Sequence, residues 1–444
     1  MDLENGSRIG VVGGGPAGSF FSYFVLEIAS RVDLDLSVDI WEPKVFEAAG
    51  PGGCNHCGGI VSESLVQLLA TEGLIIPSEV VQRGIDSYVL HTDLGRVNIA
   101  APRGEKRIAA VHRGGGPRGA ESKYGSFDGF LLQKAKEKGA NVIRKRVSKL
   151  GWNGDRPTIE AQGSPPETYD LLVGAAGINT AILKQFEQLG IEYGPPKGAK
   201  TFISELHLGS DVISRHLGHS MHVFLIDFPG IEFLAIIPKG EYATLVVLGE
   251  NVDGPLVDKL FATEAVRRCL PPGWKKEEVS CFCLPKINVG GGSGMWSDRV
   301  VMIGDSAVSR LYKDGIGAAY KTAKACASTV VFEGVSRDAF ERYYRPACRQ
   351  LTIDNAIGKL VFATVTLFRY LHPLRTGMVR MVEQEQRSDH KDMSIVLWDT
   401  FTGSAAYREI LLRSMHPGFL ARLAFHTIAG LFHSHPPASE RTAS

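Results

Sequence analysis

The chain has almost no net charge, no long apolar run and no cysteine framework. Its 49 lysines and arginines nearly balance 48 aspartates and glutamates, so nothing electrostatic favours nucleic acid as a partner. The absence of about 18 uninterrupted apolar residues disfavours a membrane-spanning helix. Seven cysteines, an odd number, indicate reduced thiols and a cytoplasmic setting. The first apolar strand begins so close to Met1 that we expect no signal peptide.

A glycine-rich turn near the start of the chain carries the clearest signal. The segment RIGVVGGGPAG places a short apolar strand, Ile9 to Val12, before a helix expected from Pro16 to about Val32. Gly13 permits the tight turn, Gly15 lets backbone N–H groups reach a phosphate, and Gly18 allows close helix packing. The pattern predicts a dinucleotide site at the helix N-terminus, although a glycine-rich connecting loop would also fit.

Glu42 ends the next apolar run, VDIWEP, and is the candidate acid for binding ribose hydroxyls. It lies 24 residues after Gly18, beyond the usual spacing of about 20, and a long first helix explains the difference. A carboxylate in this place supports the prediction of a dinucleotide site.

The 444 residues are enough for two or three domains, and the strand signals predict how they are arranged. Residues 200–289 alternate or run apolar between turn residues, which is typical of a β-sheet wall of a substrate cavity. We expect a discontinuous nucleotide domain, an inserted β domain, a helical C-terminal region and a disordered tail. The boundaries are 1–75, 105–198 and 298–335 for the first, 76–104 and 199–297 for the second, 336–432 for the third, and 433–444 for the tail.

Three motifs resemble the FAD-binding superfamily that holds p-hydroxybenzoate hydroxylase and the geranylgeranyl reductases, over roughly residues 8 to 330. They are GGGPAG, DLLVGAAG and IGDSA followed by DGIGAAYKTA. The resemblance implies an α/β (α+β overall) fold, with a Rossmann-like FAD-binding domain and an inserted β-sheet substrate domain. The implied FAD-binding residues are Gly13, Gly15, Pro16, Ala17, Gly18, Glu42, Arg113, Gly304, Asp305, Gly315, Ile316 and Gly317.

In that superfamily the aspartate of the third motif contacts the flavin ribityl chain, a role that falls to Asp305. The helix that starts near Gly315 would direct its positive end at the flavin. Cys57-Gly58-Gly59 and the helix motif of Phe127, Asp128 and Leu131 are similar to those of geranylgeranyl reductases.

Other stretches depart from the family pattern. The middle motif has Ala175-Ala176-Gly177 in place of the Ala-Asp-Gly of the hydroxylases. Loss of that aspartate argues against a hydroxylase-like interaction with the nicotinamide cofactor. The aromatic substrate motif keeps only Phe233 and Pro238, which we take as candidate substrate residues. The resemblance therefore implies the fold and the cofactor but not the substrate.

Cys54 and Cys57 admit three interpretations. They could exchange electrons with the flavin as a thiol pair. They could bind a metal with His56, or with Cys281 and Cys283, but a lone C-x-x-C is a weak metal signal. We expect instead that Cys57 lines the flavin pocket, that no metal is bound, and that Cys269, Cys326 and Cys348 are buried apolar residues.

The C-terminal region has two apolar helical patterns, Ile357 to Leu371 and Gly418 to Phe432, too short to span a bilayer. They fit either a helical cap or dimer contact, or an interfacial helix that gives peripheral membrane contact. The sequence does not determine the oligomeric state.

Among the activities of this superfamily we expect an FAD-dependent oxidoreductase that reduces carbon–carbon double bonds of an isoprenoid or similar apolar substrate, with NAD(P)H as a candidate electron donor. The alternatives are an FAD-dependent monooxygenase of an apolar or aromatic substrate, and a non-enzymatic flavin-containing binding protein. Cys57, Tyr312 and Lys313 are the candidate catalytic residues, the last two as proton donors.

Overall fold

The computed structural model describes residues 1–55, 57–101, 108–120, 124–249, 252–275 and 279–432. At its N-terminal end lies a largely parallel sheet, the nucleotide sheet, with strand order β19-β20-β12-β1-β2-β8. Its strands are β1 (Ser7–Val12), β2 (Leu36–Trp41), β8 (Asn141–Ile143), β12 (Leu171–Gly174), β19 (Trp296–Ser297) and β20 (Val300–Met302). β1 is buried between β2 and β12, as its apolar sequence predicts.

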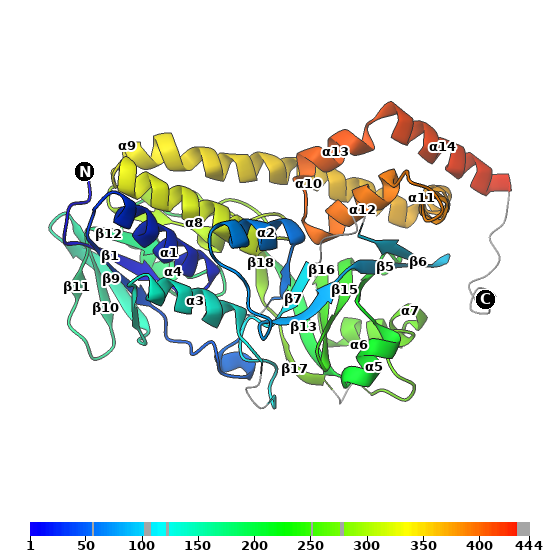
Figure 1. Ribbon diagram of the computed structural model, residues 1–444, viewed down its shortest axis with the longest axis horizontal. Helices are drawn as coiled ribbons and strands as arrows, with labels where there is room; N and C mark the ends of the chain where they lie inside the picture. The colour runs from blue at the N-terminus through cyan, green and yellow to red at the C-terminus, as the bar shows by residue number, and fades with distance from the viewer. Residues whose placement is uncertain (56, 102–107, 121–123, 250–251, 276–278, 433–444) are drawn as a thin grey trace.

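Helices pack against the nucleotide sheet at the left of Figure 1. They are α1 (Pro16–Arg31), α3 (Phe127–Glu137) and α8 (Gly315–Phe332), with the shorter α4 (Leu183–Glu187). Phe20 and Phe24 of α1 meet Tyr320 of α8 edge-on, at ring distances of 5.8 and 5.5 Å. The expected first helix is thus confirmed to within one residue.

A second, mixed sheet has the order β17-β13-β16-β15-β14-β5-β6, with β18 paired to β13. Its strands are β5 (Ser87–Thr92), β6 (Gly95–Ala100), β13 (Gly198–His207), β14 (Ser220–Phe224), β15 (Ile231–Lys239), β16 (Tyr242–Gly249), β17 (Val279–Cys283) and β18 (Lys286–Asn288). Two small sheets complete the strands: β3 (Ile60–Val61), β4 (Val81–Ile85) and β7 (Ile108–Val111), and β9 (Val147–Asn153), β10 (Arg156–Ala161) and β11 (Glu167–Thr168).

The β-rich stretch that the sequence predicts also contains helices that it did not predict. These are α5 (Ser210–His216), α6 (Gly254–Ala262) and α7 (Glu264–Arg267). They cover one face of the mixed sheet, where Leu206, Leu245 and Val247 share a core with Ile213 and Leu260. The prediction from alternating apolar residues missed these helices because they are short.

The C-terminal region is helical and runs along the top of Figure 1. Its helices are α9 (Arg337–Ala339), η4 (Phe340–Tyr344), α10 (Arg345–Tyr370), α11 (His372–Glu385), α12 (Asp392–Thr402), α13 (Tyr407–Ser414) and α14 (Pro417–Phe432). Three further short elements lie earlier in the chain: the helix α2 (Glu63–Thr71) and the 3-10 turns η1 (Gly50–Gly52) and η3 (Gly304–Ser306). Met378, Trp398 and Phe419 from these helices pack on the opposite face of the mixed sheet. The C-terminal helices are therefore a cover for that face.

The strands also refine the expected division of the chain. β19, Trp296–Ser297, joins the nucleotide sheet, although the division placed residues up to 297 in the β domain. β4, Val81–Ile85, pairs with β7 in a small sheet rather than in the mixed sheet. The expected domain boundaries therefore shift at these two short strands.

Candidate functional site

The turn between β1 and α1 has the geometry that a bound dinucleotide needs. Gly13 has φ of +107°, and a Cβ there would lie 2.6 Å from the carbonyl oxygen of Ala175. A Cβ on Gly18 would lie 1.9 Å from the carbonyl oxygen of Gly13. At Gly15 the nearest atom to an added Cβ is Nδ2 of Asn55, at 3.6 Å. Glycine is therefore required at positions 13 and 18. At position 15 no protein atom lies close enough to exclude a side chain.

The start of α1 lacks both a side-chain cap and an acidic residue in its first turn. Its positive end is thus available to an anion such as a pyrophosphate. Glu42 lies beside this turn, and its carboxylate accepts hydrogen bonds from the backbone N–H groups of Gly14, at 2.9 Å, and Lys44, at 2.8 Å. Burial raises the pKa of Glu42. The remaining lone pairs of the two oxygens are those that ribose hydroxyls would use.

The third motif lies directly against this turn. Gly304 has φ of +58°, and a Cβ there would lie 2.5 Å from the Cβ of Ala17. The close approach places Asp305 at the N-terminal end of α8, which has no side-chain cap. Burial raises the pKa of Asp305, while the Ser309 hydroxyl and the charge of Arg113 oppose the shift. Two motifs that are 290 residues apart in sequence therefore form one continuous site.

Arg113 and Cys57 also meet. The Arg113 guanidinium forms an ion pair with the fully buried Asp128 of α3, with Nη2 at 2.8 Å from Oδ2. It also hydrogen-bonds the Cys57 side chain. This pairing fixes the guanidinium orientation beside the Cys-Gly-Gly loop. The two uncapped helix starts, Glu42 and Arg113 are groups of the kind that hold the phosphate and ribose parts of FAD.

Beyond Arg113 lies an open pocket between this loop and the mixed sheet, which we call the thiol pocket. Its cavity volume is about 40 Å³, and it is open to solvent on one side. Its lining residues are Gly50, Pro51, Cys54, Cys57, His112, Arg113, Gly114, Gly116, Pro117, Ile203, Glu205, Lys239, Cys281, Phe282 and Cys283. The structure thus brings two of the predicted site residues, Cys57 and Arg113, to one cavity.

The mixed sheet contributes a polar group to this pocket. Glu205 of β13 is opposite Thr244 of β16, whose hydroxyl lies 2.9 and 3.0 Å from the two carboxylate oxygens. Lys239, with a side chain only 1% exposed, places Nζ 4.0 Å from the Glu205 carboxylate. Burial raises the pKa of Glu205, and the charge of Lys239 and the Thr244 hydroxyl oppose the shift. A carboxyl group with a raised pKa is therefore buried on this face of the sheet, beside a lysine.

His112 is the third polar group of the pocket. Burial, with a contribution from the charge of Lys239, lowers its pKa well below the usual value, so the imidazole is neutral. Its Nε2 atom is buried and has no hydrogen-bond partner among the residues that the structure describes. This nitrogen is therefore a hydrogen-bonding group that a molecule bound in the pocket could use.

The four pocket cysteines do not form a metal site in the described part of the chain. Cys54, Cys57, Cys281 and Cys283 line the same pocket, but no three of them have ligand atoms within 4.8 Å of one another. Burial raises the pKa of Cys283 to about 12. His56 lies outside the described residues. The metal interpretation of the C-x-x-C pair thus gains no geometric support, and its redox interpretation stays a prediction.

The structure does not bring Tyr312 and Lys313 to the thiol pocket. Lys313 Nζ donates to the carbonyl oxygens of Asp399 and Thr400, both at 2.6 Å, and lies over the Tyr407 ring. Burial lowers the pKa of Lys313 well below its usual value. Tyr312 packs edge-on against Phe362, with ring centroids 4.9 Å apart. These contacts tie the start of α8 to the C-terminal helices, which is a structural role.

The predicted substrate residues also lie elsewhere. Phe233 stacks on Phe401 of α12 at a ring distance of 6.0 Å, and Pro238 is buried in β15 opposite Ala243. The lining of the pocket contains neither of them. The neighbour of Pro238 in the chain, Lys239, is the residue of this stretch that reaches the pocket.

Sequence reasoning missed Glu205, Lys239 and His112. The alternation of β13 carried a signal for the first, because Ile203, Glu205 and His207 share one face of that strand. A carboxylate in that row is unusual on a face expected to be apolar. His112 precedes Arg113, and nothing in the local pattern marks it.

Comparisons with known proteins agree with this fold. No protein-family model matches the chain. A geranylgeranyl diphosphate reductase from Synechocystis is 23% identical over 354 residues, which is 73% of this chain and 75% of that protein. A geranylgeranyl bacteriochlorophyll reductase-like protein from Thermoplasma acidophilum has a TM-score of 0.63 at 12% identity, over 95% of this chain and 100% of that chain.

Similar structures also include flavin-dependent halogenases and monooxygenases. The p-nitrophenol 4-monooxygenase from Pseudomonas putida has a TM-score of 0.59 at 13% identity, over 95% of this chain and 99% of that chain. At these identities the likeness is one of fold, and it confirms the expected architecture. Both reaction classes named by the sequence resemblance occur among the proteins that share it.

Proposed function

We propose that this chain, which belongs to the geranylgeranyl reductase-like superfamily of FAD-dependent oxidoreductases, reduces carbon–carbon double bonds of an isoprenoid or similarly apolar substrate. FAD is the cofactor of this class, and when bound it supplies hydride-transfer chemistry. NAD(P)H is the candidate electron donor. The observation that carries the proposal is that Glu205 and Lys239 of the mixed sheet line one pocket with His112 and Arg113.

Reduction of a double bond adds one hydride and one proton, so the site needs a proton donor. Glu205 suits this role because burial raises its pKa, which favours the protonated form of the carboxyl group. Thr244 fixes its orientation through the hydroxyl contact. Lys239, 4.0 Å away, favours the carboxylate that forms after proton donation.

Apolar side chains lie beside the proposed reacting centre. Ile203 lines the pocket, and Ile237 and Val246 lie under Gly58, whose added Cβ would be 3.4 and 3.2 Å from their side chains. An isoprenoid chain would bury apolar surface against such residues at roughly 25 cal/mol per Å². His112 Nε2 would then bond to the bound cofactor or to a polar head of the substrate.

The C-terminal helices have an exposed apolar surface that could contact the membrane from which a lipid-like substrate would come. α14 leaves Phe425 68%, Leu431 63% and Phe432 79% exposed, on the side away from the mixed sheet. We propose that this face lies in the membrane interface while the rest of the protein stays at the cytoplasmic side. The expectation that the apolar pattern from Ile357 is too short to span a bilayer is wrong by length and composition, because it lies in a continuous helical stretch, Arg337–Tyr370, that is long and apolar enough, with 22% of its apolar window buried.

The test is anaerobic turnover of the FAD-loaded protein. After reduction by dithionite, addition of geranylgeranyl diphosphate is expected to restore the oxidised flavin spectrum, with a product heavier by two hydrogens. Reoxidation only after oxygen is admitted, with oxygen incorporated into product, would establish the monooxygenase instead. A protein that binds FAD but is reoxidised by neither would favour the binding-protein alternative, and failure to bind FAD would exclude all three.

A further inference from the structure

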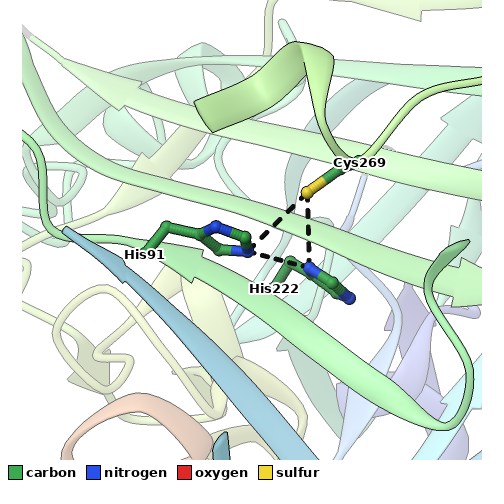
Figure 2. Close-up of side chains that lie close together, drawn as sticks. All are labelled: His91, His222 and Cys269. Atoms are coloured by element: carbon green, nitrogen blue, oxygen red, sulfur yellow. Dashed lines mark hydrogen bonds between the residues drawn. The ribbon is translucent and has the colours of Figure 1, made fainter. Parts of the chain in front are cut away.

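Three buried side chains converge on the face of the mixed sheet that is covered by α5, α6 and α7. They are His91 of β5, His222 of β14 and Cys269, which follows α7 (Figure 2). Nε2 of His91 lies 2.9 Å from Nδ1 of His222, and Sγ of Cys269 lies 3.3 Å from Nδ1 of His222 and 3.7 Å from Nε2 of His91. All three residues are at most 5% exposed.

The orientation of His222 directs the lone pair of its Nδ1 atom into this group. Its Nε2 lies 3.4 Å from the carbonyl oxygen of Leu217, so this nitrogen carries the hydrogen. Nδ1 then has the lone pair, and it faces His91 and Cys269. A backbone carbonyl that accepts from the second nitrogen of an imidazole is the usual support of a metal-binding histidine.

The separations match those between ligands of one small ion. Zinc–nitrogen bonds of about 2.0–2.1 Å and zinc–sulfur bonds of about 2.3 Å give ligand separations of about 3.3 and 3.6 Å in a tetrahedron. The two sulfur–nitrogen distances agree within about 0.3 Å of the expected value. The two nitrogens would have to separate by about 0.4 Å from their present 2.9 Å.

We propose that His91, His222 and Cys269 form a buried site for a thiophilic metal ion with a filled d shell, Zn²⁺ or Cu⁺. Imidazole and thiolate are ligands that both ions favour. Binding would displace the proton of the Cys269 thiol, because the metal ligand is the thiolate. The proposal is independent of the proposed function, since the reductase chemistry uses no metal.

The location indicates a structural role for the ion. His222 is opposite Ile236, whereas the pocket residue Glu205 shares its row with Thr244 and Ile237. Because neighbouring strand residues face opposite sides of a sheet, the three ligands lie on the side away from the thiol pocket. The ion would join the segment after α7 to two central strands and so hold the helical cover on the sheet.

Nearby charges bear on which ion is preferred. Arg96 acts electrostatically on all three groups, and Arg268 also acts on His91. One thiolate and two neutral imidazoles give a neutral complex with Cu⁺ and a cationic complex with Zn²⁺. A buried cationic complex beside two arginines is less favourable, so this electrostatic environment favours Cu⁺, whereas the ligand separations accommodate either ion.

The first experiment measures the metal content of the full-length, FAD-loaded protein after expression with added zinc or copper and purification without chelators. We expect about one ion per chain and an X-ray absorption spectrum with one sulfur and two nitrogen ligands. Cys269→Ser is expected to reduce the bound metal at least tenfold. Cys283→Ser, which removes a thiol from the other side of the sheet, is the matched control and is expected to retain the ion.

Three results would overturn the proposal. One is wild-type protein that binds neither metal, which would leave the three residues as a hydrogen-bonded cluster. Another is a bound metal with two or more sulfur ligands, which would place it among the pocket cysteines. The third is a metal content that Cys269→Ser leaves unchanged. If Cys269→Ser does not fold, the ligand count in the wild-type spectrum still decides the question.

Discussion

The two faces of the mixed sheet bury polar groups in different ways. On the face toward the nucleotide sheet, Glu205 and Lys239 line an open pocket, and the neighbouring His112 has an Nε2 atom without a partner in the described chain. On the other face, His91, His222 and Cys269 contact one another and are closed off from solvent. Both groups interrupt an otherwise apolar core.

The open pocket suits a ligand that exchanges with solvent, whereas the closed group of His91, His222 and Cys269 suits a permanently bound ion or a structural cluster. A reacting molecule must enter, so its binding groups keep unused hydrogen-bonding capacity beside an opening. A structural ion or cluster satisfies its ligands internally and benefits from complete burial. Changes on the first face should therefore alter turnover, and changes on the second should alter stability.

The largest effect is expected from Glu205→Gln. Loss of the proton donor should reduce kcat by about 10²–10⁴-fold while FAD binding and melting temperature stay near wild type. The substitution keeps the shape of the side chain and removes a buried ionisable group. Steady-state turnover with a polyprenyl substrate measures the effect.

Glu232→Gln is the matched control, because Glu232 is an exposed carboxylate of β15 in the same sheet. Its turnover should equal that of the wild type. An equal loss in both variants, or none in Glu205→Gln, would remove Glu205 from the mechanism.

A pH profile sharpens the same assignment. Burial raises the pKa of Glu205, so the protonated donor persists below the raised value and is lost above it. We expect kcat to be level at low pH and to fall about tenfold per unit above that pKa. Glu205→Gln should lack this alkaline limb, and a limb that survives the substitution would belong to another group.

The helices that cover the two faces differ as well. Among the C-terminal helices, α14 exposes apolar side chains to solvent. Phe425→Ser should weaken binding to lipid vesicles by about tenfold, since burying a Phe side chain contributes about 1.5–3 kcal/mol. Turnover of a short, water-soluble substrate should not change. Vesicle sedimentation measures the first quantity, and unaltered sedimentation would favour the cap or dimer interpretation of this helix.

The smallest effect on turnover is expected on the closed face. Cys269→Ser should lower the melting temperature of the metal-loaded protein by several degrees, while kcat changes by less than about twofold because the site is structural. Calorimetry with and without a chelator measures the stability. A large loss of kcat in a folded, FAD-loaded variant would show that the two faces are coupled.

The dinucleotide turn was predictable because its signal is local. Gly13 has a positive φ, Gly18 lies against the carbonyl oxygen of Gly13, and the helix begins at Pro16, although Gly13 also lies against the distant Ala175. Glu42 and Asp305 were identified by their distance from the turn and by resemblance, and both lie next to it. Their contacts with FAD stay a prediction.

The sequence by itself determined the strand–turn–helix unit, the alternating strands of the mixed sheet and the helical C-terminal region, because these follow from short-range sterics and apolar periodicity. Only the tertiary structure decided which side chains meet. Tyr312 and Lys313 are near the third motif in sequence, yet they pack against the C-terminal helices. His91, His222 and Cys269 are separated by 131 and 47 residues, and strand pairing and the cover helices bring them together. Contacts over such separations depend on sheet order, which no local pattern encodes.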